Sequence, residues 1–566
     1  MEFIAFLFST VIGLEILYGI KEVKASSLGI TALVLCWFAL LCRSTWISVD
    51  YSTSFPALIK VASLVLLFFN CSRIANRKEF IMSTLSAATV TGFIHGFMAI
   101  QEYIEAPPIP ATWIDPALKA YVRTRCAGIF TDPNIFGAFL AVIFILISTR
   151  LLLAQSFKDK ATAFSAMLIC GFGELTTLSR GSWIAMATGI IFMLIFHAKR
   201  RSKNLDQKLF VAAILILAAI IVTGPFKYRI FSIVKSKDMT IAQRTLINKG
   251  VAANFRHFPL TGKGLHTFNQ VYPGFRIVGG DYPMNAHNEL IHSLVESGHL
   301  SAIMLLLLAC LILYKSFVTD DEMNVFRAGF AGAFFCLIVH NMSGFSSRIL
   351  PTSALISLSA AGAAFCRISA DFETNIRKDI ARIFGIFIIG AAIFVLYEAE
   401  KCYRINSLML KGYEEMSKTE TLDQAIETFS LVERLDPANA IAAANKAEIF
   451  YARGKFAEAV SAINDALQRN PSEALYHLKL AHLLEEKNGK RADECYKEAI
   501  RLDPASELIR LEYANFLIKT GNKSEALAQL NQALKFSPGF HNVYTNYMEI
   551  EELKNQLEQE LDQASN

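Results

Sequence analysis

A histidine at the boundary between a long polar segment and an apolar run is the residue best suited to general-base chemistry. His287 stands in Met284–Gly298, just before the apolar run Leu300–Tyr314. Where a polar loop re-enters a membrane, a side chain is sheltered from bulk water and still reachable from one face. An imidazole there can accept a hydroxyl proton near neutral pH. A histidine at a helix start can equally be a capping or packed residue, and its polar neighbours Asn288 and Glu296 favour the functional interpretation.

Arginines in the polar segments suggest that a substrate carries phosphate groups. Arg125 stands in the first polar loop with Asn134, Arg180 lies in the short turn between two apolar runs, and Arg244 lies in the long loop 225–298. Guanidinium groups match phosphate oxygens bidentately, so several arginines at one membrane face suit a diphosphate. Taken singly, each could instead cap a helix end or contact lipid phosphate. Asp132-Pro133, by contrast, is typical of a helix N-cap and first helical position.

Ionisable residues inside the apolar runs form a second group of candidates. Lys60, His95, Glu174 and His340 are unusual there, because charged groups in membrane spans are costly and often functional. Lys60 and Glu174 can equally lie near an interface, where long side chains reach water.

The sequence predicts no metal, cofactor or nucleic acid. The ten cysteines are scattered without CxxC or zinc-ligand spacing, and the polar loops hold no His/Asp/Glu set with ligand spacing. Gly262-Lys263-Gly264 neither follows a strand nor opens the helix of a βαβ unit, so a nucleotide fingerprint fails on context. The net charge of +5 is weak, and the C-terminal region has no basic patch interleaved with aromatic residues.

Composition divides the chain into two domains. Hydrophobic residues make up 53% of the chain and charged residues 19%, against roughly 25% charged in soluble proteins. Residues 1–399 are apolar runs with short charged breaks and one long polar loop at 225–298, whereas residues 400–566 are polar throughout. The N-terminus lacks the basic segment and cleavage site of a signal peptide, so we expect a first span there.

About twelve apolar runs are long enough to span a membrane as helices. Basic residues gather between some of them, most strongly at Lys199–Lys203, and the positive-inside rule places that break in the cytoplasm. The loops 104–132 and 225–298 and the C-terminal domain then face the opposite side. The predicted spans are 2–20, 27–44, 56–72, 80–103, 133–154, 161–178, 182–198, 208–224, 299–317, 326–344, 351–367 and 380–398.

The C-terminal domain is an array of repeats. Pro437, Pro471, Pro504 and Pro538 recur at almost constant spacing, and small residues stand at fixed distances before each. Small residues let paired helices approach closely, and proline ends the second helix of each pair. The pattern resembles tetratricopeptide repeats, about four over residues 408–540 with a final helix to about 563. Such an array can be a spacer or a concave surface for a protein partner.

The order of the motifs in the membrane part resembles the O-antigen ligase superfamily. The motifs are Arg-x-x-Gly-x-Phe-x-Asp-Pro-Asn at 125–134, Ser-Arg-Gly at 179–181, Gly-x-Gly-x-x-Thr-Phe at 262–268 and His-Asn-Glu…Glu-x-Gly at 287–298. The superfamily includes O-antigen ligases, O-antigen polymerases and bacterial protein O-oligosaccharyltransferases. The resemblance implies an all-α, GT-C-like membrane glycosyltransferase followed here by an α-solenoid.

The resemblance also implies a reaction and a location. Such enzymes transfer a glycan from an undecaprenyl-diphosphate carrier to a hydroxyl, without a metal, at the periplasmic face of the bacterial inner membrane. His287 then matches the catalytic histidine, and Arg125, Arg180 and Arg244 match arginines for the diphosphate. Asn134, Asn288 and Glu296 are further substrate-binding candidates. Direct attack would invert the anomeric configuration, and the acceptor would be lipid A core or a protein.

Three alternatives remain open at this stage. The chain could be a polymerase of the same superfamily, which extends the glycan on its own carrier. It could be a transporter of a lipid-linked glycan, although transporters rarely need a long external loop carrying the polar motifs, and no inverted repeat of broken helices is visible. It could also be a non-catalytic scaffold acting through its repeats.

Overall fold

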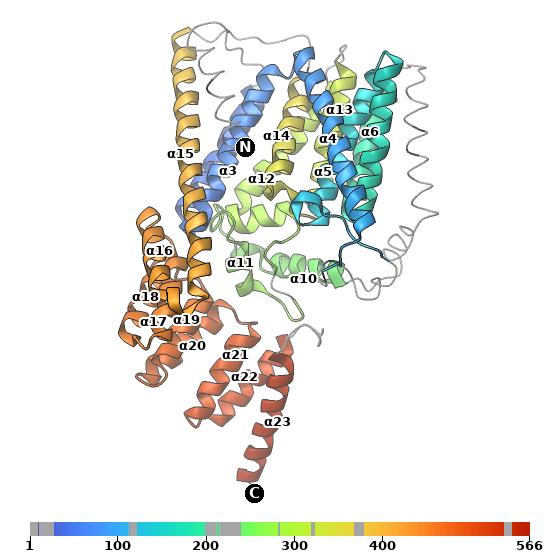
Figure 1. Ribbon diagram of the computed structural model, residues 1–566. Helices are drawn as coiled ribbons and strands as arrows, with labels where there is room; N and C mark the ends of the chain where they lie inside the picture. The colour runs from blue at the N-terminus through green and yellow to red at the C-terminus, as the bar shows by residue number, and fades with distance from the viewer. Residues whose placement is uncertain are drawn as a thin grey trace.

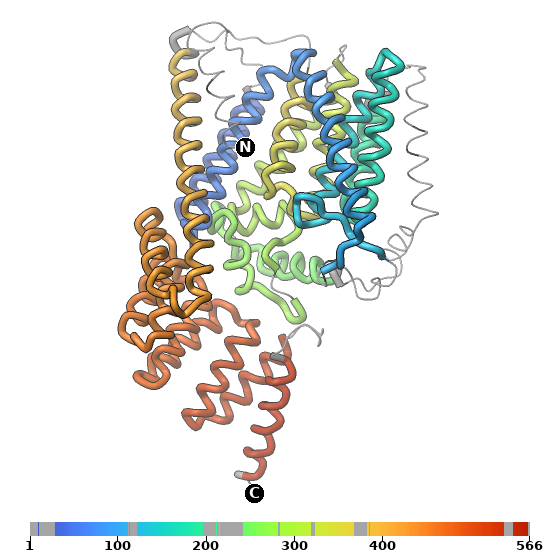
Figure 2. The backbone as a smooth tube through the Cα atoms, viewed as in Figure 1, coloured from blue at the N-terminus to red at the C-terminus, as the bar shows by residue number. Residues whose placement is uncertain are grey.

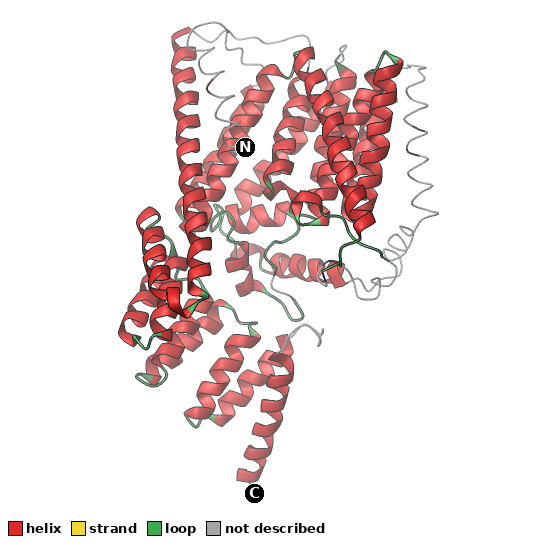
Figure 3. Cartoon of the chain, viewed as in Figure 1, coloured by secondary structure: helices red, strands yellow, loops and turns green. Residues whose placement is uncertain are grey.

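The computed structural model describes residues 28–110, 122–198, 239–280, 283–318, 323–366, 378–536 and 546–565, with the single residues 10, 113, 211 and 214. The described residues contain helices and loops but no β-strand (Figure 3). The α-helices are α2 (Leu28–Trp46), α3 (Tyr51–Ile74), α4 (Lys78–Glu105), α5 (Pro133–Leu153), α6 (Phe157–Thr176), α7 (Arg180–Ala198), α10 (Met239–Ala253), α11 (Phe268–Val271), α12 (Glu289–Val318), α13 (Asn324–Asn341), α14 (Leu350–Phe365), α15 (Lys378–Met416), α16 (Leu422–Leu435), α17 (Ala440–Ala452), α18 (Phe456–Arg469), α19 (Ala474–Leu484), α20 (Gly489–Leu502), α21 (Glu507–Lys519), α22 (Lys523–Phe536) and α23 (Asn546–Ser565).

The first two-thirds of the chain form a helical membrane domain (Figure 1). Five described helices are long and apolar enough to cross a membrane, namely α2, α3, α4, α5 and α12, and α7 and α14 include shorter apolar stretches. Ten of the twelve predicted ranges fall on helices. The other two, 2–20 and 208–224, lie almost entirely outside the described residues. The all-helical class is therefore confirmed, and the number of twelve spans stays a prediction.

Helix α5 is the centre of this domain. It packs against α4, α6, α7 and α13, and nearly every side chain along it is buried. Its start follows the sequence expectation, because the Asp132 carboxylate accepts hydrogen bonds from the backbone N–H groups of Asn134 and Ile135, and Pro133 takes the first helical position. A helix that is apolar on all sides is stable only when other helices surround it. Helices α4, α6, α7 and α13 accordingly surround α5.

A kink in α12 interlocks with the loop that follows α10. Gly298 has φ +85° inside α12, and Gly262 in the facing loop has φ +79°. The two backbones touch so closely that a Cβ on Gly298 would lie 2.4 Å from the Gly262 nitrogen. The Glu296 carbonyl accepts hydrogen bonds from the backbone N–H groups of Lys263 and Gly264, both at 2.9 Å. Only glycine fits at either side of this contact.

An ion pair also stabilises the contact between α12 and the loop after α10. Arg348, in the short helix η6 (Ser346–Arg348), donates to both carboxylate oxygens of Glu296 at 3.1 and 2.8 Å. Glu296 Oε1 also accepts the backbone N–H of Phe268 at 3.2 Å. The linker between α13 and α14, the kinked α12 and the loop 259–268 are thereby joined through one buried carboxylate.

A single continuous helix connects the membrane domain to the repeat array. Helix α15 runs unbroken from Lys378 to Met416, so the expected domain boundary at 399/400 lies inside it (Figure 2). At 1.5 Å per residue its 39 residues extend for about 58 Å. It packs against α3 at one end and against α16 at the other. A continuous helix transmits orientation, so the array is held at a defined angle to the bundle.

The array has the core expected of tetratricopeptide repeats. Ala425, Ala459, Ala492 and Ala526 are fully buried, as are the small residues seven positions later. Helices α16, α18 and α20 end just before Pro437, Pro471 and Pro504 respectively; Pro538 lies outside the described residues.

Direct contacts also tie the array to the loops at the end of the bundle. Ser52 hydrogen bonds Asp436, and the Arg276 guanidinium donates to the Ala505 carbonyl. Asn470 Nδ2 donates to Gln270 Oε1 at 3.3 Å. The array and the loops after α10 therefore share one end of the membrane domain (Figure 1).

The interlocked glycines give a prediction about stability. Gly262→Ala or Gly298→Ala should lower the thermal unfolding midpoint of the purified protein strongly, because strain at positive φ, roughly 1–2 kcal/mol, adds to a backbone clash. Gly279→Ala is the matched control. Gly279 lies in the same polar segment at φ +76°, yet its nearest neighbour to a Cβ is 3.9 Å away, so only the strain applies. Equal shifts in all three variants would contradict the interlock.

Candidate functional site

His287 sits in a strained turn directly before α12. Its backbone has φ +52°, in the left-handed region that residues with a Cβ seldom adopt. The preceding residue is held in place, because the Ala286 N–H donates to His292 Nε2 at 2.8 Å and the His292 ring is fully buried. The following residue, Asn288, caps α12 by accepting the N–H groups of Leu290 and Ile291. The turn therefore has fixed neighbours on both sides.

The imidazole of His287 is partly buried and lies close to Arg244. Its ring contacts Phe345 at a centroid distance of 5.1 Å, and within the described part of the chain its Nδ1 has no hydrogen-bond partner. Burial, then the charge of Arg244, then His340 lower the pKa of His287 to about 3. Both burial and a neighbouring cation disfavour the imidazolium. The ring is consequently neutral at physiological pH, which a general base requires.

Arg244 and the turn at Arg180 approach the same loop. Arg244, on α10, donates from Nη1 to the Ser343 carbonyl at 2.7 Å. Arg180 opens α7, and a Cβ on the adjacent Gly181 would lie 3.1 Å from Ser343 Oγ and 3.9 Å from the ring of His340. Three predicted site residues from distant parts of the sequence thus meet around the end of α13.

Arg125 and Asn134 are connected to His340 through the Asn134 backbone. Arg125 is almost fully buried and donates from Nε to the Thr177 carbonyl at 3.1 Å and from Nη2 to Asn134 Oδ1 at 3.3 Å; it also bonds the Trp113 carbonyl. The Asn134 backbone hydrogen bonds His340. Arg125 therefore joins three chain segments with its own hydrogen bonds. Its contact with a diphosphate stays a prediction.

Asn288 and Glu296 have structural partners as well. Asn288 is the cap described above, and Glu296 is bound by Arg348. Neither finding tests whether they also bind substrate, which stays a prediction. The sequence analysis did not predict Arg348 as a site residue. A signal was present, because it stands in a short polar break between two apolar runs, as Arg180 does.

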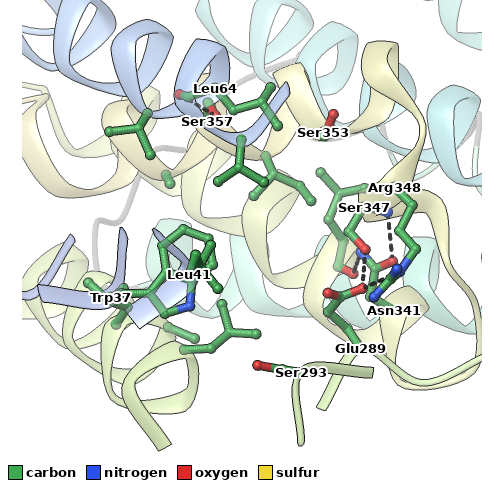
Figure 4. Close-up of a pocket in the computed structure, with 18 of the residues that line it drawn as sticks. Trp37, Leu41, Leu64, Glu289, Ser293, Asn341, Ser347, Arg348, Ser353 and Ser357 are labelled. Atoms are coloured by element: carbon green, nitrogen blue, oxygen red, sulfur yellow. Dashed lines mark hydrogen bonds and ion pairs between the residues drawn. The ribbon is translucent and has the colours of Figure 1, made fainter. Parts of the chain in front are cut away.

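A cavity of about 320 Å³ lies beside this cluster, between α2, α3, α12, α13 and α14 (Figure 4). Its walls are largely aliphatic and aromatic side chains. Its polar lining residues include Lys60, His266, Glu289, Asn341 and Arg348. Figure 4 shows Arg348, Ser347, Asn341 and Glu289 gathered at one side, with the apolar side chains extending away from them.

Metal ligands do not gather in the part of the chain that the structure describes. No group of three or more His, Cys, Asp or Glu side chains there could hold a metal ion.

Comparisons with known proteins match family models to the membrane part and to the repeat array. Residues 164–306 match the family described as O-antigen ligase, a range that includes Arg180, Arg244, His287 and Glu296 but not Arg125. Residues 418–474 and 483–545 match two families described as tetratricopeptide repeat.

The comparison with curated proteins gives no match. Among solved structures, the crystal structure of yeast Tom70 aligns at 11% identity with a TM-score of 0.27, covering 84% of this chain and 96% of that chain. A score this low carries no argument about fold or function. The family matches confirm the suspected resemblance: residues 164–306 of the membrane part match an O-antigen ligase family, and the C-terminal part of the chain matches tetratricopeptide repeats.

Proposed function

We propose that this protein is a membrane glycosyltransferase that moves a glycan from undecaprenyl diphosphate to a hydroxyl acceptor at the periplasmic face of the bacterial inner membrane. The observation that carries the proposal is the convergence of His287, Arg244 and Arg180 on the loop after α13, within or beside the matched O-antigen ligase region. The loop after α10 and the repeat array lie at one end of the bundle, which supports placing both in the periplasm.

The proposed reaction needs a base and a site for a leaving anion. The acceptor oxygen attacks the anomeric carbon from the face opposite the carrier, and its proton passes to His287. The bond from the anomeric carbon to the diphosphate oxygen breaks, and both electrons leave with undecaprenyl diphosphate. Arg180 and Arg244 stabilise the developing negative charge. Attack from the opposite face inverts the anomeric configuration, and no step requires a metal.

Arg244 has two effects in this scheme. In the empty site burial and, after it, Arg244 keep His287 neutral, but a base with so low a pKa would accept a proton poorly. A bound diphosphate offsets the positive charge of Arg244 and so raises the pKa of His287 in the donor complex. Donor binding would thereby make the base stronger at the moment it is needed.

The first test is the base itself. His287→Ala should abolish glycan transfer by the purified protein and leave expression and donor binding close to wild type. His257→Ala is the matched control, since His257 is an exposed histidine of the same polar segment and should keep the full rate. A His287→Ala protein with the wild-type rate would refute the mechanism.

A pH profile tests the effect of the donor on the base. Because the free-enzyme pKa of His287 is about 3, kcat/KM should stay level as the pH falls from 7 to about 5. The acid limb of kcat, which reports the donor complex, should lie at higher pH. Acid limbs that coincide near the ordinary histidine pKa would contradict the proposed role of Arg244.

Conservative arginine variants test diphosphate binding. Arg180→Lys and Arg244→Lys keep the charge but lose the forked donor geometry, so transfer should fall by about tenfold or more. Arg256→Lys, an exposed arginine in the same polar segment, should have no effect. Full activity in both site variants would indicate simple contacts with membrane lipid.

The glycan profile of a deletion strain separates attachment from polymerisation. A transferase that attaches finished glycans should leave long, unattached chains on their carrier when it is deleted. Single repeat units instead would identify a polymerase of the same superfamily. Loss of transfer together with lipid-linked glycan trapped on the cytoplasmic side would identify a transporter.

A further inference from the structure

A buried carboxyl group lies beside the turn that carries Arg180. Glu174, an ionisable residue of a predicted span, belongs to α6, and its side chain is fully buried. Its Oε1 lies 2.6 Å from the hydroxyl of Ser182, which stands in the first turn of α7. Within the described residues its Oε2 has no hydrogen-bond partner. Ionisable groups are costly inside a membrane protein, and the proposed reaction makes no use of this one.

Two short contacts at the Ser182 hydroxyl need two hydrogens. The Ser182 Oγ lies 2.6 Å from Glu174 Oε1 and 2.9 Å from the Ser179 carbonyl oxygen. A hydroxyl carries one hydrogen, and a carbonyl can only accept. If Ser182 donates to the carbonyl, the hydrogen of the other contact comes from Glu174, which is then a protonated acid. Neutrality also suits full burial, because ionised carboxylates inside proteins need a paired cation, and the described residues provide none for Glu174.

The turn between α6 and α7 depends on such a contact because its backbone is strained. Leu178 has φ +52°, in the left-handed region that residues with a Cβ seldom adopt. A Cβ on Gly137 of α5 would lie 2.5 Å from Ser182 Oγ, so α5 packs directly on the hydroxyl. A strained conformation persists only where its surroundings fix it. The contact between Glu174 and Ser182 fixes the end of the turn that carries Arg180.

We propose that Glu174 is a neutral positioning residue: its protonated carboxyl donates to Ser182 and holds the turn, and with it Arg180, in the position that the donor diphosphate requires. The inference rests on the proposed function, in which Arg180 contacts the donor. Glu174 itself touches no substrate and acts through Ser182. Because the carboxyl is neutral, it fixes the turn without adding a negative charge that would repel the diphosphate.

Three variants separate the hydrogen bond from the charge. Glu174→Gln keeps the shape and offers an amide N–H to Ser182, whereas Glu174→Met keeps the bulk and removes the donor. Ser182→Ala removes the partner and leaves the carboxyl in place. Ser148→Ala is the matched control, because Ser148 is also a fully buried hydroxyl and contacts Met167 of α6. It lies about three helical turns along α5 from Gly137.

Binding of undecaprenyl diphosphate, the carrier without its glycan, is measured for each full-length protein in nanodiscs. We expect Glu174→Met and Ser182→Ala to raise its Kd by about fivefold to tenfold, the effect of one lost hydrogen bond. Glu174→Gln and Ser148→Ala should keep the wild-type Kd, and the acceptor KM should stay level in all four.

The double variant Glu174→Met/Ser182→Ala should bind no more weakly than either single variant, because both changes remove one contact. Additive losses would overturn the action through Ser182. Weakened binding in Glu174→Gln would overturn the neutral role, since that variant lacks only the capacity for charge. Ser182→Ala and Glu174→Gln decide the matter if Glu174→Met does not fold.

An infrared difference spectrum tests the protonation without any substrate. Wild type minus Glu174→Gln at neutral pH should show the C=O stretch of a protonated carboxylic acid, and carboxylate bands in its place would overturn the neutral state. Arg180→Lys separates this inference from the proposed function. Weaker binding in Arg180→Lys together with wild-type binding in Glu174→Met would refute the positioning role alone. Wild-type binding in Arg180→Lys would refute the proposed role of Arg180 in donor binding, whatever the infrared spectrum shows.

Discussion

The contact between the kinked α12 and the loop after α10 is the constraint on which the candidate site depends. Gly298 and Gly262 let two backbones meet at a distance that any Cβ would prevent. The carbonyl of Glu296 binds that loop and its carboxylate binds Arg348, so a single residue fixes three segments. The turn that carries His287 begins the same helix, and its position follows from this anchoring.

Burial and charge set the properties of His287 and of the groups near it. Arg244 donates to the Ser343 carbonyl, and the turn at Arg180 approaches Ser343, so both arginines belong to segments beside the loop after α13. A largely apolar cavity, with Glu289 and Ser347 in its lining, adjoins the two segments whose His287 and Phe345 rings are in contact. A neutral imidazole close to guanidinium groups is the arrangement on which the proposed transfer rests.

The continuous helix α15 gives the repeat array a fixed place. Because the range 380–398, predicted as the last span, and the start of the array belong to one helix, no flexible linker separates them. Hydrogen bonds from Ser52 and Arg276 hold the array against the loops near the site. The array therefore lies against the end of the membrane domain that carries the loop after α10.

The sequence by itself determined the features that depend only on residues close together in the chain. Apolar runs predicted ten of the described helices, repeat spacing predicted the tetratricopeptide array, and Asp132-Pro133 predicted the start of α5. Only the tertiary structure decided which polar groups meet. Arg348 and Glu296 are 52 residues apart, and Arg125 proved to be an interior clamp bound to backbone carbonyls. Periodicity records which face of a helix is buried, but pairing between distant segments depends on how whole helices pack, and that packing is a property of the folded chain.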